Sequence, residues 1–308
     1  MNDHRASRDA IRVDDEVADA VRDGRPVVAL ETTVYSLLGL PSPANEDALA
    51  ACLKAVRDAG AVPALTAVID GVARVGVAEA EHERVLGARA KVAERDLGVA
   101  VGASWPVGVT TVSASLALAA RAGVRVFATG GIGGVHRDVH RSGDISADLE
   151  AVARHTIVTV CAGAKSFLDL PRTVEHLETL GVTVLGYGTD ELPAFTVPSS
   201  GVPLPHRVDD APTAARIAAA RWALGGGGLL VAVPVPADAA LDATVLDVAT
   251  TEALADADRA GVSGAAVTPY VLERVATITG GASVRANTAL VTQNAAIAAA
   301  IAGALATG

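Results

Sequence analysis

Short apolar runs recur along the chain and alternate with longer stretches in which apolar residues return every three or four positions. An apolar run bounded by Gly or Pro is typical of a buried strand, and the longer period is typical of an amphipathic helix. The runs predict strands at residues 26–30, 63–69, 72–77, 99–101, 124–128, 157–161, 182–185 and 229–233. The longer period predicts helices at residues 45–59, 81–90, 251–260, 270–277 and 287–304.

This alternation of strands and helices predicts an α/β fold, layered α/β/α with a mostly parallel central sheet. One exception is expected at Asp70 and Gly71, because an Asp-Gly pair between two apolar runs is a strong signal for an antiparallel hairpin. There is no internal repeat and no low-complexity linker in the sequence. We therefore expect residues 1–308 to form a single α/β domain.

Composition narrows the class of protein and its partners. Hydrophobic residues make up 51% of the 308 residues and charged residues only 19%, which excludes a disordered chain. A formal net charge of −10 argues against nucleic acid as a partner, because no basic stripe offsets the acidic surface. A small phosphorylated substrate remains compatible, since a few amides and lysines can bind a phosphate on an acidic protein.

The two ends of the chain and the cysteines bear on localisation. The first 21 residues are charged throughout and contain no apolar stretch typical of an export signal. The apolar segment at residues 295–305 is mostly alanine and looks too short to span a bilayer, so a packed helix is expected. Cys52 and Cys161 lie in apolar surroundings, as expected for a reducing compartment. A soluble, cytoplasmic protein with no membrane partner is the expectation.

Side chains that can take part in catalysis or ligand binding follow three of the predicted strands. Glu31 comes directly after the first strand, Thr129 follows the strand at 124–128, and Lys165 lies four residues after Cys161. Ligands in α/β folds bind beyond the carboxyl ends of the strands. We therefore expect these side chains to meet in one site.

Two of these side chains, a lysine and a glutamate, are of the types that serve as a nucleophile and as a general acid/base. Lys165 follows Ala-Gly-Ala, and a desolvated lysine amine loses proton affinity and can form a Schiff base with a sugar aldehyde. Glu31 lies between an apolar strand and two hydroxyls, where a raised pKa suits a general acid/base. The structural alternatives are a salt-bridging lysine and a carboxylate that caps the following turn.

A polar series with a spacing of four residues follows the glycine-rich turn at residues 130–134: His136, His140, Asp144 and Asp148. A zinc site formed by the first three is one interpretation, but Gly134 and Gly143 favour a loop over a continuous helix. A hard divalent cation held by one or two aspartates and waters is preferred. Without a ligand, one aspartate would act as a helix cap.

The glycines at residues 130–134 resemble a dinucleotide-binding turn only in composition, because the GxGxxG spacing is absent. Close approach of the backbone to a small ligand is the better interpretation. Lys91 and the hydroxyl-rich residues 110–115 are further candidates for anion binding. Their alternatives are a solvated lysine at a helix end and an ordinary helix start.

Several segments together resemble the pseudouridine-5′-phosphate glycosidase family, which is related to a protein of indigoidine biosynthesis. They are LETT at residues 30–33, GLP at 39–41, GAVPA at 60–64, TTV at 110–112, TGGIGGVHR at 129–137, DISADL at 144–149, CAGAKS at 161–166, GYGTDELPAF at 186–195, VTP at 267–269 and AN at 286–287. The resemblance runs from about residue 16 to the C-terminal helix, and the blocks around His136, Asp144 and Lys165 are long and unusual.

The resemblance implies a homotrimeric α/β enzyme, a reversible C-glycosidase that splits pseudouridine 5′-phosphate into uracil and ribose 5-phosphate with a divalent metal, typically Mn²⁺. Matched residue by residue, Lys165 corresponds to the covalent nucleophile, Glu31 to the proton donor and Asp144 to the metal ligand. The positions matched to substrate binding are Lys91, Val112, Ser146, Ala147 and Asp148, joined by Thr129, His136 and Asn287.

Three segments depart from the family pattern, at residues 35–39, 92–98 and 103–107. They leave the matched nucleophile, acid and metal ligand in place but bear on which base or sugar is preferred. Two other classes of function remain open. One is a Schiff-base lyase or aldolase acting on another sugar phosphate, and the other is a non-catalytic protein that binds a sugar phosphate.

Overall fold

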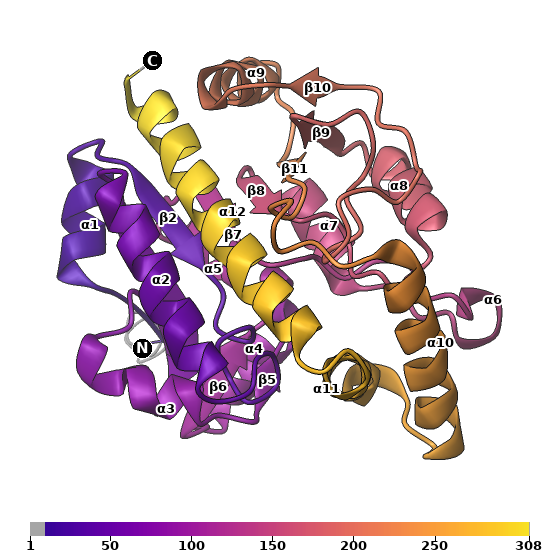
Figure 1. Ribbon diagram of the computed structural model, residues 1–308. Helices are drawn as coiled ribbons and strands as arrows, with labels where there is room; N and C mark the ends of the chain where they lie inside the picture. Colours follow the sequence, from indigo (N-terminus) through magenta and orange to yellow (C-terminus); the bar gives the residue numbers. More distant parts are fainter. Residues whose placement is uncertain (1–9, 308) are drawn as a thin grey trace.

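A computed structural model describes residues 10–307 of the chain (Figure 1). Its strands are β1 (Ile11–Val13), β2 (Val27–Leu30), β3 (Val62–Ile69), β4 (Val72–Val75), β5 (Lys91–Val92), β6 (Val107–Thr110), β7 (Val126–Ala128), β8 (Val158–Cys161), β9 (Thr183–Tyr187), β10 (Arg207–Val208) and β11 (Leu229–Ala232). Its α-helices are α1 (Asp15–Arg22), α2 (Ala44–Asp58), α3 (His82–Leu86), α4 (Leu97–Gly102), α5 (Val112–Arg121), α6 (Val139–Ser142), α7 (Ala147–Arg154), α8 (Leu170–Thr179), α9 (Ala211–Ala223), α10 (Ala243–Arg259), α11 (Val267–Ile278) and α12 (Ala282–Thr307).

The strands form one mostly parallel sheet, as the sequence predicted. Its order is β1-β4-β3-β2-β7-β8-β11-β9-β10, with β6 pairing β3 and β5 pairing β6. Among the described strands, only the pairs that β3 forms with β4 and β6 are antiparallel. The hairpin predicted at Asp70 and Gly71 is confirmed, and both residues have a positive φ, of 51° and 72°. A tight turn of this hand favours Asp followed by Gly.

Helices cover both faces of the sheet because its central strands are apolar on both sides. Val27 and Ala29 of β2 belong to the core beneath α1, α5, α7 and α8, whereas Val28 and Leu30 belong to the core beneath α2, α9 and α12. Successive side chains of a strand point to opposite faces, so one short run contributes to both cores. This arrangement confirms the predicted α/β/α layers.

Helix α12 crosses one face of the sheet diagonally and contacts β2, β7 and β8 between α2 and α9 (Figure 1). It is longer than predicted, and its length and apolar composition alone would suffice to cross a membrane. The expectation that this segment is too short to span a bilayer is therefore wrong. The expectation of a packed helix is confirmed, since Leu290, Ala295 and Ile301 are completely buried in the fold.

Two predicted elements differ from the structure. Residues 99–101 lie in helix α4 rather than in a strand, because Leu97, Ala100 and Val101 contact the core with helical spacing while Val99 is 57% exposed. The helix predicted at 81–90 is limited to α3, which follows a short 3₁₀ turn and ends at Gly87. The chain then extends, so that Lys91 begins β5 and is not a lysine at a helix end.

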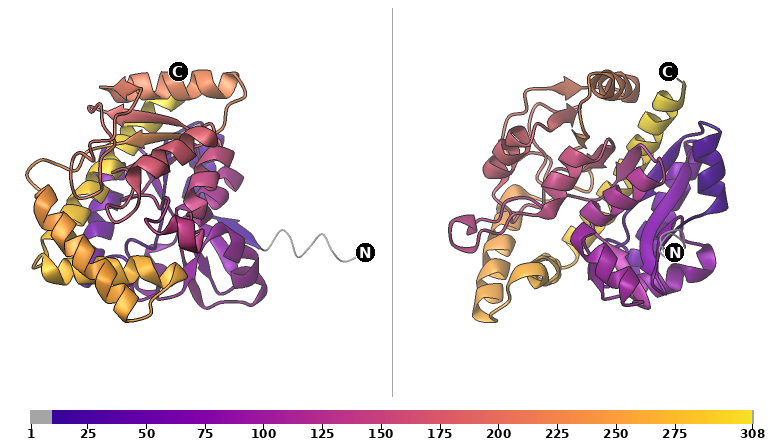
Figure 2. Two further views of the ribbon diagram at one scale, coloured as in Figure 1. Left: turned by 90° about the vertical axis from the view of Figure 1, so that its right-hand side faces the viewer. Right: turned by 180° about the vertical axis from the view of Figure 1, so that it is seen from behind.

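Helices α10 and α11 lie together at the end of the molecule opposite to α9 (Figure 2). A 3₁₀ turn at Gly264–Ala266 connects them, and α11 then leads into the start of α12. The first turn of α11 faces the carboxyl ends of the central strands, where the cleft described next is found.

Candidate active site

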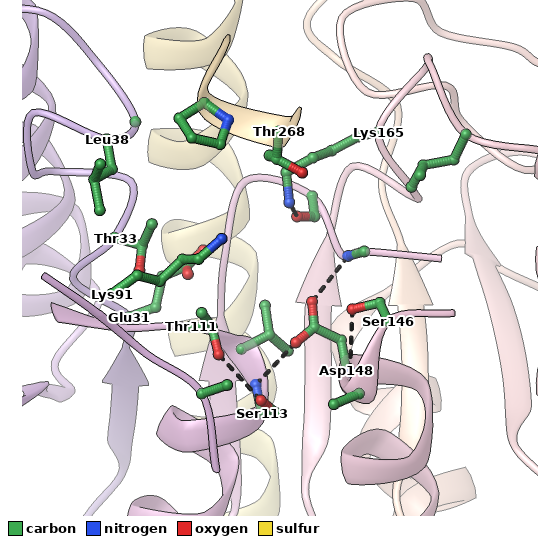
Figure 3. A pocket seen from close by; sticks show the side chains of 18 of the residues that line it. Glu31, Thr33, Leu38, Lys91, Thr111, Ser113, Ser146, Asp148, Lys165 and Thr268 are labelled. Atoms are coloured by element: carbon green, nitrogen blue, oxygen red, sulfur yellow. Dashed lines mark hydrogen bonds between the residues drawn. The ribbon is translucent and has the colours of Figure 1, made fainter. Parts of the chain in front are cut away.

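The predicted convergence of strand ends is confirmed. Glu31 follows β2, the turn at Thr129 follows β7, and Lys165 follows β8, and these three strands are neighbours in the sheet. Glu31 and Lys165 line a cleft of about 570 Å³ at this edge (Figure 3). Eight of the other predicted site residues line the same cleft, namely Lys91, Val112, His136, Asp144, Ser146, Ala147, Asp148 and Asn287.

Glu31 is a buried carboxyl group with one protein donor. Its side chain is 7% exposed, and the hydroxyl of Thr129 donates a hydrogen bond to its Oε1. Burial raises the pKa of Glu31 to about 7, against the opposing effects of Lys165 and of the Thr129 hydroxyl. The raised pKa expected from the sequence is therefore confirmed. Thr129 itself is behind Glu31 rather than among the residues that line the cleft.

The amine of Lys165 is held by the glycine-rich turn. Its Nζ donates to the carbonyl oxygen of Gly131 at 2.7 Å, which is a neutral partner and not the carboxylate of a structural ion pair. The segment that carries Lys165 is also joined to the glycine-rich turn through the backbone, since Lys165 N donates to Ile132 O at 3.2 Å. Gly163, with φ of 71°, is required here because a Cβ would lie 2.0 Å from Pro193 O.

Two helices point their N-termini at the cleft. Val112 is the first residue of α5, and Ala147 is the first residue of α7 after the N-cap Ser146. A helix N-terminus presents free backbone amides and a partial positive charge, so it favours an anionic group. Ser113 of α5 and Ser146 at the start of α7 mark these two helix ends in the lower part of Figure 3.

Asp148 connects these elements. One of its carboxylate oxygens accepts from Ser113 N at 3.1 Å, and the other accepts from Gly133 N at 2.9 Å (Figure 3). The side chain is 8% exposed, so these bonds satisfy a nearly buried charge. Asp148 thereby fixes the glycine-rich turn against the start of α5, in addition to lining the cleft.

Lys91 brings a second amine to the cleft from the start of β5. It is half-buried, and burial together with the nearby charge of Lys165 lowers its pKa, whereas Asp148 acts in the opposite direction. The cleft therefore contains two lysines and the carboxyl groups of Glu31, Asp144 and Asp148.

Asp144 and His136 form the part of the cleft with metal-binding character. Their Oδ2 and Nε2 atoms are 3.7 Å apart, and Asp144 is partly exposed to the cleft. His140 is exposed, and within residues 10–307 no group of three or more His, Cys, Asp or Glu side chains converges. The alternative of a three-ligand zinc site is therefore not supported. One carboxylate facing open space does fit a hard cation that keeps most of its waters.

Several lining residues were not predicted as site residues. Thr33, Arg95, Phe195, Thr268 and Leu272 also border the cleft. Phe195 and Thr268 lie in segments of the family resemblance, which was a usable signal, whereas Leu272 is an ordinary apolar position of α11. The hydroxyl-rich segment 110–115, a predicted candidate for anion binding, supplies Thr111, Val112 and Ser113 to the lining of the cleft.

The family model described as indigoidine synthase A-like protein matches residues 16–304. The chain belongs to this family. It is 52% identical to the pseudouridine-5′-phosphate glycosidase of Myxococcus xanthus (strain DK1622), over 92% of this chain and 95% of that protein. It is also 52% identical to the pseudouridine-5′-phosphate glycosidase of Rhodospirillum centenum (strain ATCC 51521 / SW), over 96% and 92% of the two chains. The resemblance seen in the sequence motifs is confirmed.

Two solved structures share the fold of this enzyme family. The prealnumycin C-glycosynthase AlnA, in complex with ribulose 5-phosphate, superposes with a TM-score of 0.87 at 40% identity, covering 96% of this chain and 97% of AlnA. An indigoidine synthase A-like protein from Thermotoga maritima gives a TM-score of 0.86 at 31% identity, with 96% of each chain covered. Both likenesses extend over nearly the whole chain.

Proposed function

We propose that this protein reversibly cleaves pseudouridine 5′-phosphate to uracil and ribose 5-phosphate through a covalent sugar intermediate on Lys165. The observation that carries the proposal is the buried Glu31, with a pKa of about 7, in the same cleft as the Lys165 amine. An acid that is protonated near neutral pH and a lysine nucleophile are the two groups that such a cleavage needs. The activity of the named relatives supports the choice of substrate.

The cleft offers a place for each end of the substrate. The N-termini of α5 and α7, with Lys91 beside them, suit the 5′-phosphate. The sugar carbon C1′ then lies at Lys165 and the base lies on the far side of it, toward Phe195 and Asn287. Ser146, Ala147 and Val112 contact the phosphate end in this arrangement, and His136 the sugar. A sugar phosphate bound to AlnA supports this class of ligand.

A carbon–carbon glycosidic bond has no leaving oxygen that an acid can protonate, so two carboxylates alone are poorly suited to cleave it. In the proposed mechanism, the amine of Lys165 attacks C1′ while Glu31 protonates the ring oxygen, and the C1′–O4′ bond breaks. The ammonium formed on Lys165 returns its proton to Glu31, Glu31 adds it to uracil C5, and the nitrogen lone pair then expels uracil to leave an iminium. Water hydrolyses the iminium, releases ribose 5-phosphate and restores the amine.

A divalent cation, Mn²⁺ in the family, completes the proposal. Asp144 would hold it from the edge of the cleft, with His136 nearby and waters in the remaining positions. When bound, the cation would offset the charge of the phosphate and order the waters around the sugar.

The assembly and the location of the protein also follow the family in this proposal. A homotrimer would have three times the 30.8 kDa mass of the chain, which light scattering after size-exclusion chromatography measures directly. A mass equal to one chain at micromolar concentration would contradict it.

A cytoplasmic location is consistent with Cys52 and Cys161, which are both free and buried.

Uracil release from pseudouridine 5′-phosphate tests the function. We expect release by the wild-type protein with Mn²⁺, and loss of release in Lys165→Ala and in a metal-stripped sample. Release that survives in Lys165→Ala would disprove the covalent mechanism. No release by the wild type, with other sugar phosphates then cleaved, would instead indicate a Schiff-base lyase or aldolase.

A further inference from the structure

A second cavity, of about 650 Å³, lies directly beside the catalytic cleft. Its walls are largely apolar and include Leu40, Phe167, Leu246 and Val275. Six residues line both cavities and so form the partition between them: Leu38, Gly39, Phe195, Pro269, Leu272 and Asn287. Phe195 is the only aromatic residue of this partition and its largest side chain.

The backbone holds Phe195 in an unusual conformation. Its φ is 63°, in the left-handed region that bulky residues rarely adopt and that the surrounding structure has to impose. Phe195 N donates to Ala162 O at 2.9 Å, which ties the residue to the strand end that leads to Lys165. The backbone of Phe195 is thus held by the same segment that carries Lys165.

One edge of the ring lies beside the glycine-rich turn. A Cβ placed on Gly131 would lie 2.7 Å from Phe195 Cδ2, and one placed on Gly130 would lie 3.4 Å from Phe195 Cε2. Gly131 O accepts the hydrogen bond from Lys165 Nζ at 2.7 Å, so the ring lies beside the same residue that holds the amine. The base of the substrate is bonded to the carbon that Lys165 attacks, so it lies next to this partition.

We propose that Phe195 determines which base the enzyme accepts, because its ring closes the base end of the cleft and restricts the site to a single pyrimidine ring. This inference rests on the proposed function. The apolar cavity beyond Phe195 is then space that the native enzyme does not use for its substrate. Removal of the ring joins the two cavities and allows a base with an apolar extension to bind.

The synthetic direction of the reaction provides the assay. Ribose 5-phosphate is incubated with uracil or with 1-benzyluracil, whose N1 substituent leaves ring carbon C5 free. In either case C5 bonds to C1′ of the sugar, the C5 proton is lost to a base, and one water is released for each C-riboside formed. The C-riboside product is separated by chromatography and identified by its mass.

Phe195→Gly is the main variant, because glycine adopts a φ of 63° without strain and the change removes the whole ring. We expect the wild type to ribosylate uracil and to exclude 1-benzyluracil. In Phe195→Gly the rate with 1-benzyluracil relative to uracil rises by roughly tenfold or more. Phe195→Leu, which keeps an apolar side chain, gives an intermediate ratio and serves if the glycine variant does not fold.

Tyr270→Ala is the matched control, since Tyr270 lines the second cavity but not the cleft and its loss leaves the partition closed. This variant keeps the wild-type ratio. The inference is overturned if the wild type uses 1-benzyluracil as readily as uracil, if folded Phe195 variants still exclude it, or if they lose activity with both bases. A wild type that ribosylates neither base disproves the proposed function itself, and this inference with it.

Discussion

The carboxyl group of Glu31 is buried at the end of β2, with the Thr129 hydroxyl as its donor. That Glu31 and Lys165 would lie in one cleft was predictable from the sequence, because each follows an apolar strand in an α/β pattern. The role of Thr129 was not, since the sequence places it among the residues that touch substrate. Only the folded chain shows that β7 lies beside β2, so that this hydroxyl meets Glu31.

Glu31 makes the protein less stable as the pH rises. The folded state binds the proton more tightly than the unfolded chain, because the pKa increases from 4.5 to about 7. Its unfavourable contribution is absent below pH 4.5 and grows to about 3 kcal/mol as the pH passes 7. Glu31→Gln removes this titration, so urea unfolding should show a stability gain over wild type at pH 8 and little gain at pH 4.5.

Glu83→Gln is the control for this measurement, because Glu83 is an exposed glutamate on α3. It should show no such pH-dependent gain. Parallel stability curves for wild type and Glu31→Gln between pH 4.5 and 8 would mean that the carboxyl group is not desolvated as described.

The Thr129 hydroxyl affects the pKa of Glu31. Its hydroxyl stabilises the ionised carboxylate and so lowers the pKa of Glu31 against the effect of burial. Thr129→Val keeps the shape and removes the donor, so the pKa of Glu31 should rise. Because the proposed mechanism uses Glu31 as the proton donor, the alkaline fall of kcat/KM with pH should move to higher pH in this variant. Thr33→Val should leave the fall in place, since the Thr33 hydroxyl donates to Thr110 O; an unmoved profile for Thr129→Val contradicts the assignment.

At the scale of helices and strands, the site depends on the hydrogen bonds that hold the glycine-rich turn against the neighbouring helices. Asp148 binds it to the start of α5, and Asn294 of α12 donates to Thr129 O at 2.8 Å from the other face of the sheet. The sequence indicated that these glycines approach a ligand but not which elements hold them. Those contacts join residues that are 35 and 165 positions apart, beyond the reach of local patterns.

Asp148→Asn tests how much the two hydrogen bonds of Asp148 stabilise the glycine-rich turn. An asparagine presents an NH₂ donor to one of the two backbone amides that the carboxylate now satisfies, which leaves a nearly buried donor unpaired. We expect a loss of about 1–3 kcal/mol in the free energy of unfolding, measured in urea without metal. Asp144→Asn, on a partly exposed side chain nearby, should lose far less. Equal losses in the two variants would show that Asp148 has no special role in holding the turn.

Local patterns were also insufficient for some secondary structure. The apolar run at residues 99–101 is too short to distinguish a strand from one side of a helix. In the structure it belongs to helix α4, in which Leu97 also packs on the core with helical spacing. Gly87 ended the predicted helix early, which placed Lys91 in an extended segment that enters the cleft. Helix α2 and strand β3 match their predicted ranges to within one residue at each end, whereas α10 and α12 begin eight and five residues earlier than predicted.

For the whole molecule, the sequence predicted the layers and the edge of the sheet that carries the site. It did not predict that α10 and α11 would bring Thr268 and Leu272 over the cleft, nor the cavity behind Phe195. Both result from packing between segments far apart in the sequence, such as residues 37–42 and 269–284 around the second cavity. The same packing explains α12, whose composition resembles a membrane span and whose buried side chains form one of the two cores.

The central claim is that Lys165 forms the bond to the sugar, and reductive trapping tests it most directly. The chain has only three lysines, Lys54, Lys91 and Lys165, so peptide mapping after borohydride treatment with ribose 5-phosphate can assign the site. We predict an adduct with the mass of the reduced sugar phosphate on Lys165, and none in Lys165→Ala. An adduct on Lys91, or no adduct on a protein that releases uracil, would contradict the account.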